Sequence, residues 1–138
     1  TDVSEEAGIF GGVNGYGLSV AVSDFNHDGY PDIYVSNDFH EDDYYYLNTG
    51  EGSFRESLKE KFSHTSRFSM GNDVADINGD GYKDIYLTSK LVVPGEKESD
   101  PIEYAGPAFV ELIYNPKKSE FEFGKHTAKI ETYEYYEN

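Results

Sequence analysis

Residues 24–34 read DFNHDGYPDIY, and residues 76–86 read DINGDGYKDIY. The two segments lie 52 residues apart and are identical at 8 of 11 positions. Self-similarity at a fixed spacing is typical of repeat architectures, in which each repeat is one supersecondary unit. The sequence therefore predicts two structurally equivalent units.

Both segments are flanked by stretches with the character of β-strands. Alternating apolar residues precede the first segment at Leu18, Val20 and Val22, and apolar runs follow the two segments at residues 33–35 and 85–87. Period-two alternation of β-branched and aromatic residues is typical of strands. Each segment is therefore expected to be the loop between two antiparallel strands.

Two hairpins are expected further along, at residues 44–55 with a turn at 49–52, and at residues 109–123 with a turn at 116–119. Each unit thus supplies about four strands over roughly 50 residues, the size of a β-propeller blade. We predict an all-β fold of β-propeller-type blades, each of four antiparallel strands. The 138 residues provide about two to three blades, so the chain is a partial propeller or a fragment of one.

This interpretation divides the chain into four parts. Residues 1–17 are expected to be the end of a preceding blade and a turn, 18–62 the first blade, 63–126 the second blade, and 127–138 a C-terminal strand or tail. Residues 94–107 contain three Pro and two Gly, which predicts a long surface loop within the second blade. Residues 58–62 have the pattern of a short helical turn.

Composition narrows the possible partners. The chain has 27 Asp and Glu against 11 Lys and Arg, a formal charge of −16, which disfavours nucleic acids and anionic surfaces. No apolar run approaches the roughly 18 residues that membrane insertion by a helix requires. There is no Cys, which excludes disulfides and cysteine-ligated metals. The 13 Tyr and 9 Phe provide the apolar surface for a folded domain, with a hard metal ion as its expected staple.

Each repeated segment has the spacing of a calcium-binding loop. Oxygen-bearing side chains occupy positions 1, 3, 5 and 9, Gly occupies position 6, and a backbone carbonyl at position 7 completes the set. The predicted ligands are Asp24, Asn26, Asp28, Tyr30 and Asp32 in the first loop, and Asp76, Asn78, Asp80, Tyr82 and Asp84 in the second. An EF-hand is excluded, because position 12 is Val35 or Leu87 and the flanks are β-like. We predict two Ca²⁺ sites; the alternative for each segment is an ordinary acidic turn.

These residues resemble the FG-GAP/VCBS repeat family, which occurs in integrin α-chain propellers, and in particular its ASPIC/UnbV-like members. The resemblance is strong over residues 15–54 and 70–87 and fades after about residue 90. It implies that the ten predicted ligands bind calcium in the loop between two strands of a blade. It also implies an extracellular location, secreted or at the cell surface, where calcium is abundant enough to fill sites of modest affinity.

Other polar clusters are assigned less specific roles. His27, His40, His64 and His126 share no ligand spacing, and His27 is expected to point outward. The acidic run of Asp38 and residues 41–43 is interpreted as a solvated loop. The tyrosines at 44–46, 133, 135 and 136 leave open either packing between blades or a protein or carbohydrate contact surface.

We therefore expect a calcium-binding extracellular module for adhesion, protein binding or assembly, and not an enzyme. Two or three blades cannot close a propeller, so their edges need other propeller blades or identical chains, in a homo-oligomeric ring or a filament. Two alternatives stay open. The chain is a scaffold fragment of a larger secreted enzyme or redox protein, or it is a self-assembling structural subunit.

Overall fold

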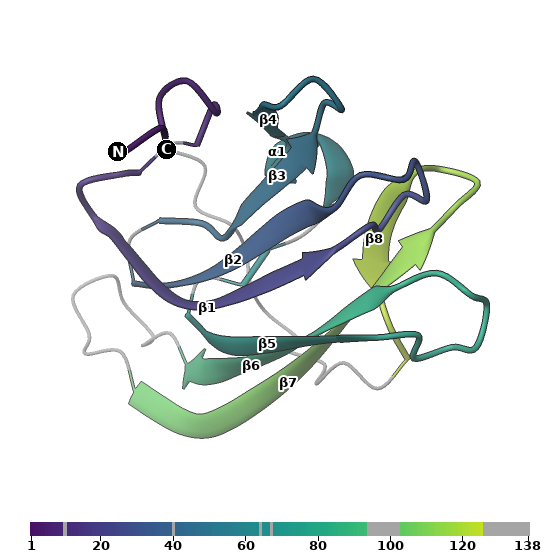
Figure 1. Ribbon diagram of the computed structural model, residues 1–138. Helices are drawn as coiled ribbons and strands as arrows, with labels where there is room; N and C mark the ends of the chain where they lie inside the picture. Colours follow the sequence, from purple (N-terminus) through teal and green to yellow (C-terminus); the bar gives the residue numbers. More distant parts are fainter. Residues whose placement is uncertain (10, 40, 64, 67, 94–102, 126–138) are drawn as a thin grey trace.

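The computed structural model describes residues 1–9, 11–39, 41–63, 65–66, 68–93 and 103–125. In this part the chain forms two four-stranded sheets and one turn of helix, which confirms the all-β prediction (Figure 1). The elements are β1 (Gly15–Ser23), β2 (Asp32–Phe39), β3 (Tyr44–Asn48), β4 (Phe54–Glu56), α1 (Leu58–Lys61), β5 (Ser69–Ala75), β6 (Asp84–Val93), β7 (Glu103–Asn115) and β8 (Glu120–Phe123). No helix in the described ranges is long and apolar enough to cross a membrane.

Each sheet is an antiparallel meander in which every strand pairs with its neighbours in sequence. Sheet A has the order β1-β2-β3-β4, and sheet B has the order β5-β6-β7-β8. The two predicted hairpins are present, with Asn48 opposite Phe54 and Asn115 opposite Glu120. Two successive four-stranded meanders are the arrangement expected of two propeller blades.

The two sheets also match in register. Val20 pairs with Val35 in sheet A, and Asn72 pairs with Leu87 at the positions 52 residues later. The pairing shifts between Gly17 and Ser19 and again, 52 residues on, between Ser69 and Gly71. The equivalence of the two units thus extends beyond the repeated loops to the strands and their irregularities.

One boundary differs from expectation. The loop expected at 94–107 ends earlier, because β7 begins at Glu103 and pairs with β6 as far as Val93. Pro107 is expected in that loop but lies in β7, opposite Lys90 of β6. Within the described residues β8 pairs with β7 only from Leu112 onward, so no described strand pairs with the other edge of β7 at Pro107. Residues 94–102 and the tail expected at 127–138 lie outside the described residues.

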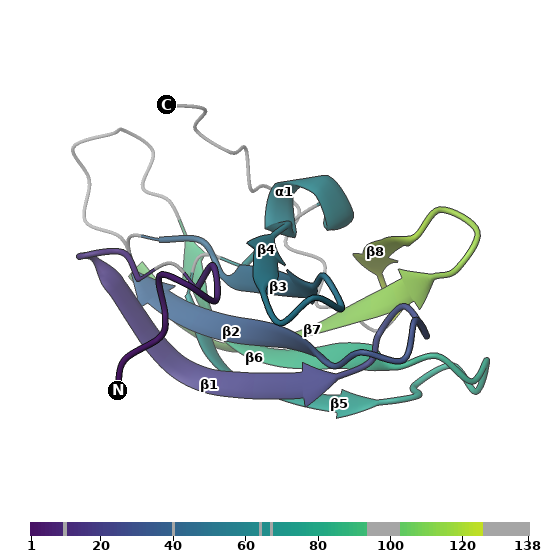
Figure 2. The same cartoon turned by 45° about the horizontal axis from the view of Figure 1, so that its top comes forward.

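The core lies between the two sheets and under α1 (Figure 2). Its centre is a group of mutually contacting aromatic rings, joined by aliphatic residues of β6 and β7. The rings are Phe25, Tyr34, Tyr45, Phe62, Tyr114 and Phe121, and the aliphatic residues are Ile85, Leu87, Val110 and Leu112. Tyrosine and phenylalanine thus provide most of the core volume of this acidic chain, as the composition predicts.

Candidate functional site

The two repeated segments form the β1–β2 loop and the β5–β6 loop, which lie at the same end of the two sheets (Figures 1 and 2). The loops are in direct contact. The His27 ring stacks on the Tyr82 ring with centroids 4.2 Å apart and an angle of 15° between their planes. His27 is exposed as expected, and it also joins one loop to the other.

The first loop is held by its own acidic and amide side chains. The Asp28 amide N–H donates to Asp24 Oδ1 and to Asn26 Oδ1, both at 3.1 Å. The Gly29 N–H donates to Asp24 Oδ2 at 2.9 Å, and the Tyr30 N–H donates to Asp28 Oδ1 at 2.9 Å. The side chains at positions 1, 3 and 5 are therefore gathered on the inner side of one tight turn.

The second loop repeats this pattern atom for atom. The Asp80 N–H donates to Asp76 Oδ1 and Asn78 Oδ1, both at 3.0 Å. The N–H groups of Gly81 and Tyr82 donate to Asp76 Oδ2 and Asp80 Oδ1, both at 2.9 Å. Because 8 of 11 residues are shared, the same side chains produce the same local fold twice.

Positive φ angles allow each turn to close. Gly29 and Gly81 at position 6 have φ of 92° and 93°, a conformation that costs a residue with a Cβ atom free energy. Position 4 has φ of 58° at His27 and 75° at Gly79, so a side chain is accommodated there. Gly is therefore required at position 6 more than at position 4.

Gly81→Ala is expected to lower the free energy of unfolding by about 1 to 2 kcal/mol, through backbone strain alone. No atom lies within 4 Å of the position that a Cβ on Gly81 would occupy, so no clash contributes. Gly11→Ala is the matched control, because its Cβ position is equally open and its φ lies outside the left-handed region. Urea denaturation measures both; equal losses would contradict the assignment of strain to position 6.

The carboxylates at position 9 lie deeper than the others. Asp32 and Asp84 are fully buried, and the Oδ1 atoms of both accept a backbone N–H from the third strand of their sheet, Asn48 at 2.9 Å and Tyr114 at 2.8 Å. Burial raises the pKa of both carboxyls, and the charge of Asp28 or Asp80 beside them adds to the rise, while the N–H donors lower it. Position 9 therefore ties each loop to the sheet behind it.

The donor set of each loop fits a hard cation such as Ca²⁺. In the first loop, two carboxylates and one amide oxygen converge on one turn. The carboxylate at position 9 lies close enough to interact electrostatically with the carboxylate at position 5. No three His, Asp or Glu side chains within the described residues are grouped to hold a metal by themselves. The Asn oxygen at position 3 and the Tyr30 or Tyr82 carbonyl would therefore have to complete the shell.

The acidic run after β2 differs from the solvated loop expected there. Asp42 is exposed, but Asp38 and Asp43 are buried. Asp43 accepts hydrogen bonds from the Tyr34 hydroxyl, from the Asn37 N–H at 2.8 Å and from the Ser69 hydroxyl at 2.7 Å. Asp43 thus joins sheet A to β5, and these three donors are why a carboxylate is tolerated in the core.

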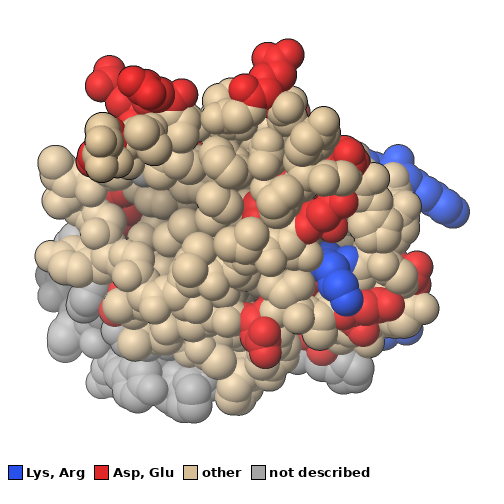
Figure 3. Space-filling model, viewed as in Figure 1, with Lys and Arg blue, Asp and Glu red and all other residues tan. Residues whose placement is uncertain are grey.

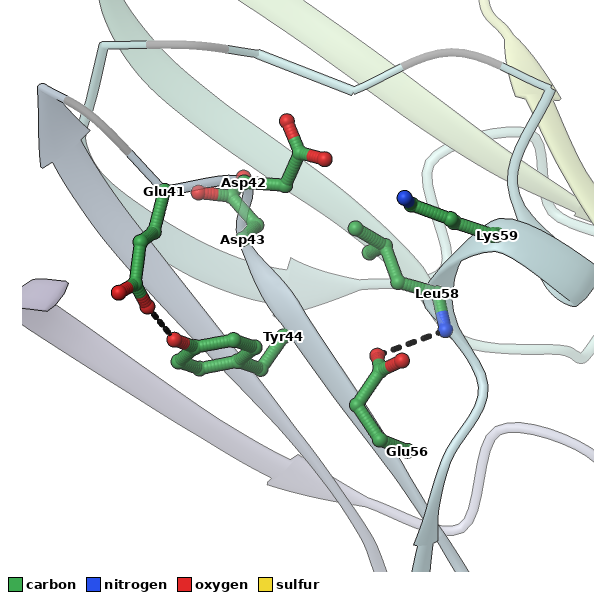
Figure 4. Close-up of a pocket in the computed structure, with 7 residues that line it drawn as sticks. All are labelled: Glu41, Asp42, Asp43, Tyr44, Glu56, Leu58 and Lys59. Carbon is green, nitrogen blue, oxygen red and sulfur yellow. Dashed lines mark hydrogen bonds between the residues drawn. The ribbon is translucent and has the colours of Figure 1, made fainter. Parts of the chain in front are cut away.

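An open hollow of about 500 Å³ lies beside this run, lined by Glu41, Asp42, Asp43, Tyr44, Glu56, Leu58 and Lys59 (Figure 4). Two of its carboxylates accept hydrogen bonds from neighbouring groups of the protein. Glu41 accepts from the Tyr44 hydroxyl, and Glu56 Oε1 accepts from the Leu58 N–H at 2.8 Å at the start of α1. His40, His64 and His126 lie outside the described residues.

Comparison with known protein families gives one match. Residues 24–87, from the start of the first loop to the strand after the second, match the FG-GAP-like repeat. The match contains both candidate metal loops and the hydrogen-bonding pattern they share. The curated proteins and solved structures compared with the chain gave no match.

Proposed function

We propose that this chain is a β-propeller-type module that binds two Ca²⁺ ions, one in each repeated loop, because residues 24–87 match the FG-GAP-like repeat. The observation that carries the proposal is the atom-for-atom repetition of the loop. Positions 1, 3 and 5 present the same oxygen atoms to the same turn in both copies. An acidic turn that served only as a connection would not need this repetition.

In this proposal calcium is a structural staple. Without a cation, the carboxylates at positions 1, 5 and 9 repel one another. Burial raises the pKa of Asp32 and Asp84, and the charges of Asp28 and Asp80 add a smaller rise. A bound divalent cation would reverse that repulsion. Since His27 stacks on Tyr82, binding of Ca²⁺ in either loop would also stabilise the conformation of the other loop.

We propose further that the module acts outside the cell in adhesion, protein binding or assembly. Sites made of exposed loops with a single amide and a few carboxylates suit the high calcium concentration found there. A binding role is favoured over catalysis, because Glu41, Asp43 and Glu56 around the larger hollow are engaged by the protein's own hydroxyl and N–H groups.

Calcium is expected to raise the melting temperature of the chain, and titration calorimetry should count two sites. At a calcium concentration of 100 times Kd, each site would add about 2.7 kcal/mol to the free energy of unfolding. Asp28→Ala and Asp80→Ala should each remove one site, and the double variant should remove the response. Glu5→Ala is the control for loss of one exposed acidic charge. A melting curve of the wild type that calcium leaves unchanged would refute the proposal.

A further inference from the structure

Among the described residues, the first two strands of each sheet bury one face against the other sheet and leave the opposite face largely exposed. The repeat exchanges the buried and the exposed face. In sheet A, Ala21 and Tyr34 face sheet B and are 7% and 0% exposed, whereas their equivalents in sheet B are the exposed Asp73 and Tyr86, the latter 37% exposed. The face that sheet A buries is therefore the face that sheet B leaves open.

The converse holds for the other face. In sheet B, Ile85 and Leu87 are 0% exposed and pack in the core. Their equivalents in sheet A, Ile33 and Val35, are only partly buried, and the neighbouring Val20 and Val22 on β1 are 61% and 60% exposed. We call the row of Val20, Val22, Ile33 and Val35 the outer face of sheet A. These four side chains lie on the face of sheet A opposite to Ala21 and Tyr34.

The opposite surface is the outer face of sheet B, defined by Asp73, Tyr86, Thr88 and Phe109. Tyr86 stacks on Phe109 with ring centroids 5.8 Å apart, and Phe109 is 45% exposed. A shallow hollow of about 200 Å³ opens there, lined by Gly71, Asn72, Asp73, Tyr86 and Thr88.

The contact between the two sheets shows what would occupy this hollow. There, Asn72 of sheet B lies between two serines of sheet A, accepting from Ser19 Oγ at 3.3 Å and donating to Ser36 Oγ at 2.7 Å. The equivalents of Ser19 and Ser36 are Gly71 and Thr88, which line the hollow, and the equivalent of Asn72 is Val20. Gly71 and Thr88 therefore occupy the same structural position in sheet B as Ser19 and Ser36 in sheet A, where Asn72 of the neighbouring sheet is bound.

We propose that a second copy of this chain docks here, with the outer face of its sheet A on the outer face of sheet B and its Val20 in the hollow beside Gly71. This docking proposal rests on the β-propeller-type module proposed above, and it identifies the partner as a second copy of the chain. The interface is head to tail, so it generates a closed ring or an open filament. Closing a propeller of roughly four to eight blades would take about two to four copies.

The charge distribution is compatible with this contact. The chain carries a formal charge of −16, which opposes association, but a broad area over β1 is free of charged side chains (Figure 3). Acidic side chains gather instead along the upper and right-hand margins of that view. Since repulsion between the acidic copies, including that of Asp73 at the hollow, opposes the contact, added salt should strengthen the association.

Sedimentation velocity of the full chain tests the proposal, and the wild type should form concentration-dependent oligomers. Val20→Glu places a charge on one face and Tyr86→Glu on the other, and each should weaken self-association at least about tenfold. Val13→Glu adds the same charge at a residue that is 98% exposed and off both faces, and it should assemble as the wild type does.

Mixing the two face variants gives the sharpest readout. Each retains the face that the other has lost, so a 1:1 mixture should form a heterodimer although neither variant self-associates. This recovery also shows that both variants are folded. Asp73→Ala introduces the residue that sheet A has at the equivalent position, Ala21. Because it removes a charge from the hollow, this variant should associate more strongly than the wild type.

A wild type that stays monomeric at its highest soluble concentration, or a mixture that yields no heterodimer, would overturn the proposal. Each measurement is made with calcium and with a chelator. A monomer whose melting temperature rises with calcium would refute this inference alone. An oligomer that is indifferent to calcium would refute the calcium proposal alone.

Discussion

Phe121→Ala is expected to lower the free energy of unfolding by about 3 to 5 kcal/mol, the largest effect of any single substitution proposed for this chain. The Phe121 ring is 1% exposed and stacks on Phe62 at 4.3 Å between centroids. It also contacts Phe25, Tyr45 and Tyr114 edge-on, at 5.6, 5.8 and 5.1 Å. Its removal would leave a cavity where residues of both sheets and the end of α1 meet.

Phe123→Ala is the matched control. Phe123 is two residues further along β8, and its ring is 47% exposed. The substitution removes the same atoms with little cavity, so a loss below about 1 kcal/mol is expected. Urea denaturation of both variants gives the comparison. Similar losses would mean that the rings around Phe121 do not form the core of this chain.

In the absence of calcium, stability is expected to fall as pH rises from about 4 to about 6. Burial raises the pKa of Asp43 to about 6 from an ordinary 3.8, although its three donors oppose the rise. Between these values the folded state holds a proton that the unfolded state has released, so folding loses free energy as pH rises. The shift corresponds to about 3 kcal/mol. The raised pKa values of Asp32 and Asp84 act in the same direction.

Asp43→Asn should flatten this pH dependence. Asn keeps an acceptor for the Asn37 N–H, and its amide group can donate to the hydroxyls of Tyr34 or Ser69, so the variant should fold. Asp42→Asn removes the neighbouring exposed charge and should retain most of the slope. Chemical denaturation at pH 4, 5, 6 and 7 with a chelator measures the three proteins. An unchanged slope in Asp43→Asn would assign the proton to other groups.

Local structure was largely predictable from residue patterns. The strands beside the repeated loops, both hairpins and the helical turn at Leu58–Lys61 occur where the sequence places them. Each depends on neighbours within about a dozen residues, such as the turn between Asn48 and Phe54. The start of β7 at Glu103 was missed, because its pairing with Val93 is a contact between strands on either side of a proline- and glycine-rich stretch.

The role of Asp43 could not be predicted. Asp42 and Asp43 are chemically identical neighbours, yet one is exposed and the other is buried under Ser69 of the second sheet. Only the local alternation into β3, which buries Tyr45 as well, hints at which of the two turns inward. The donors that make this burial possible come from 9 and 26 residues away along the chain.

The sequence by itself determined that the chain has two equivalent units, because the DxNxDGxxD pattern builds the same turn from its own side chains wherever it occurs. Only the tertiary structure decided which face of each unit is buried. Val20 and Val22 look like core residues by their alternation, yet they face outward, whereas Ile85 and Leu87 on the equivalent face are buried. The physical reason is that burial depends on which sheet packs against which face, and the two units here stack head to tail, so they pack through opposite faces.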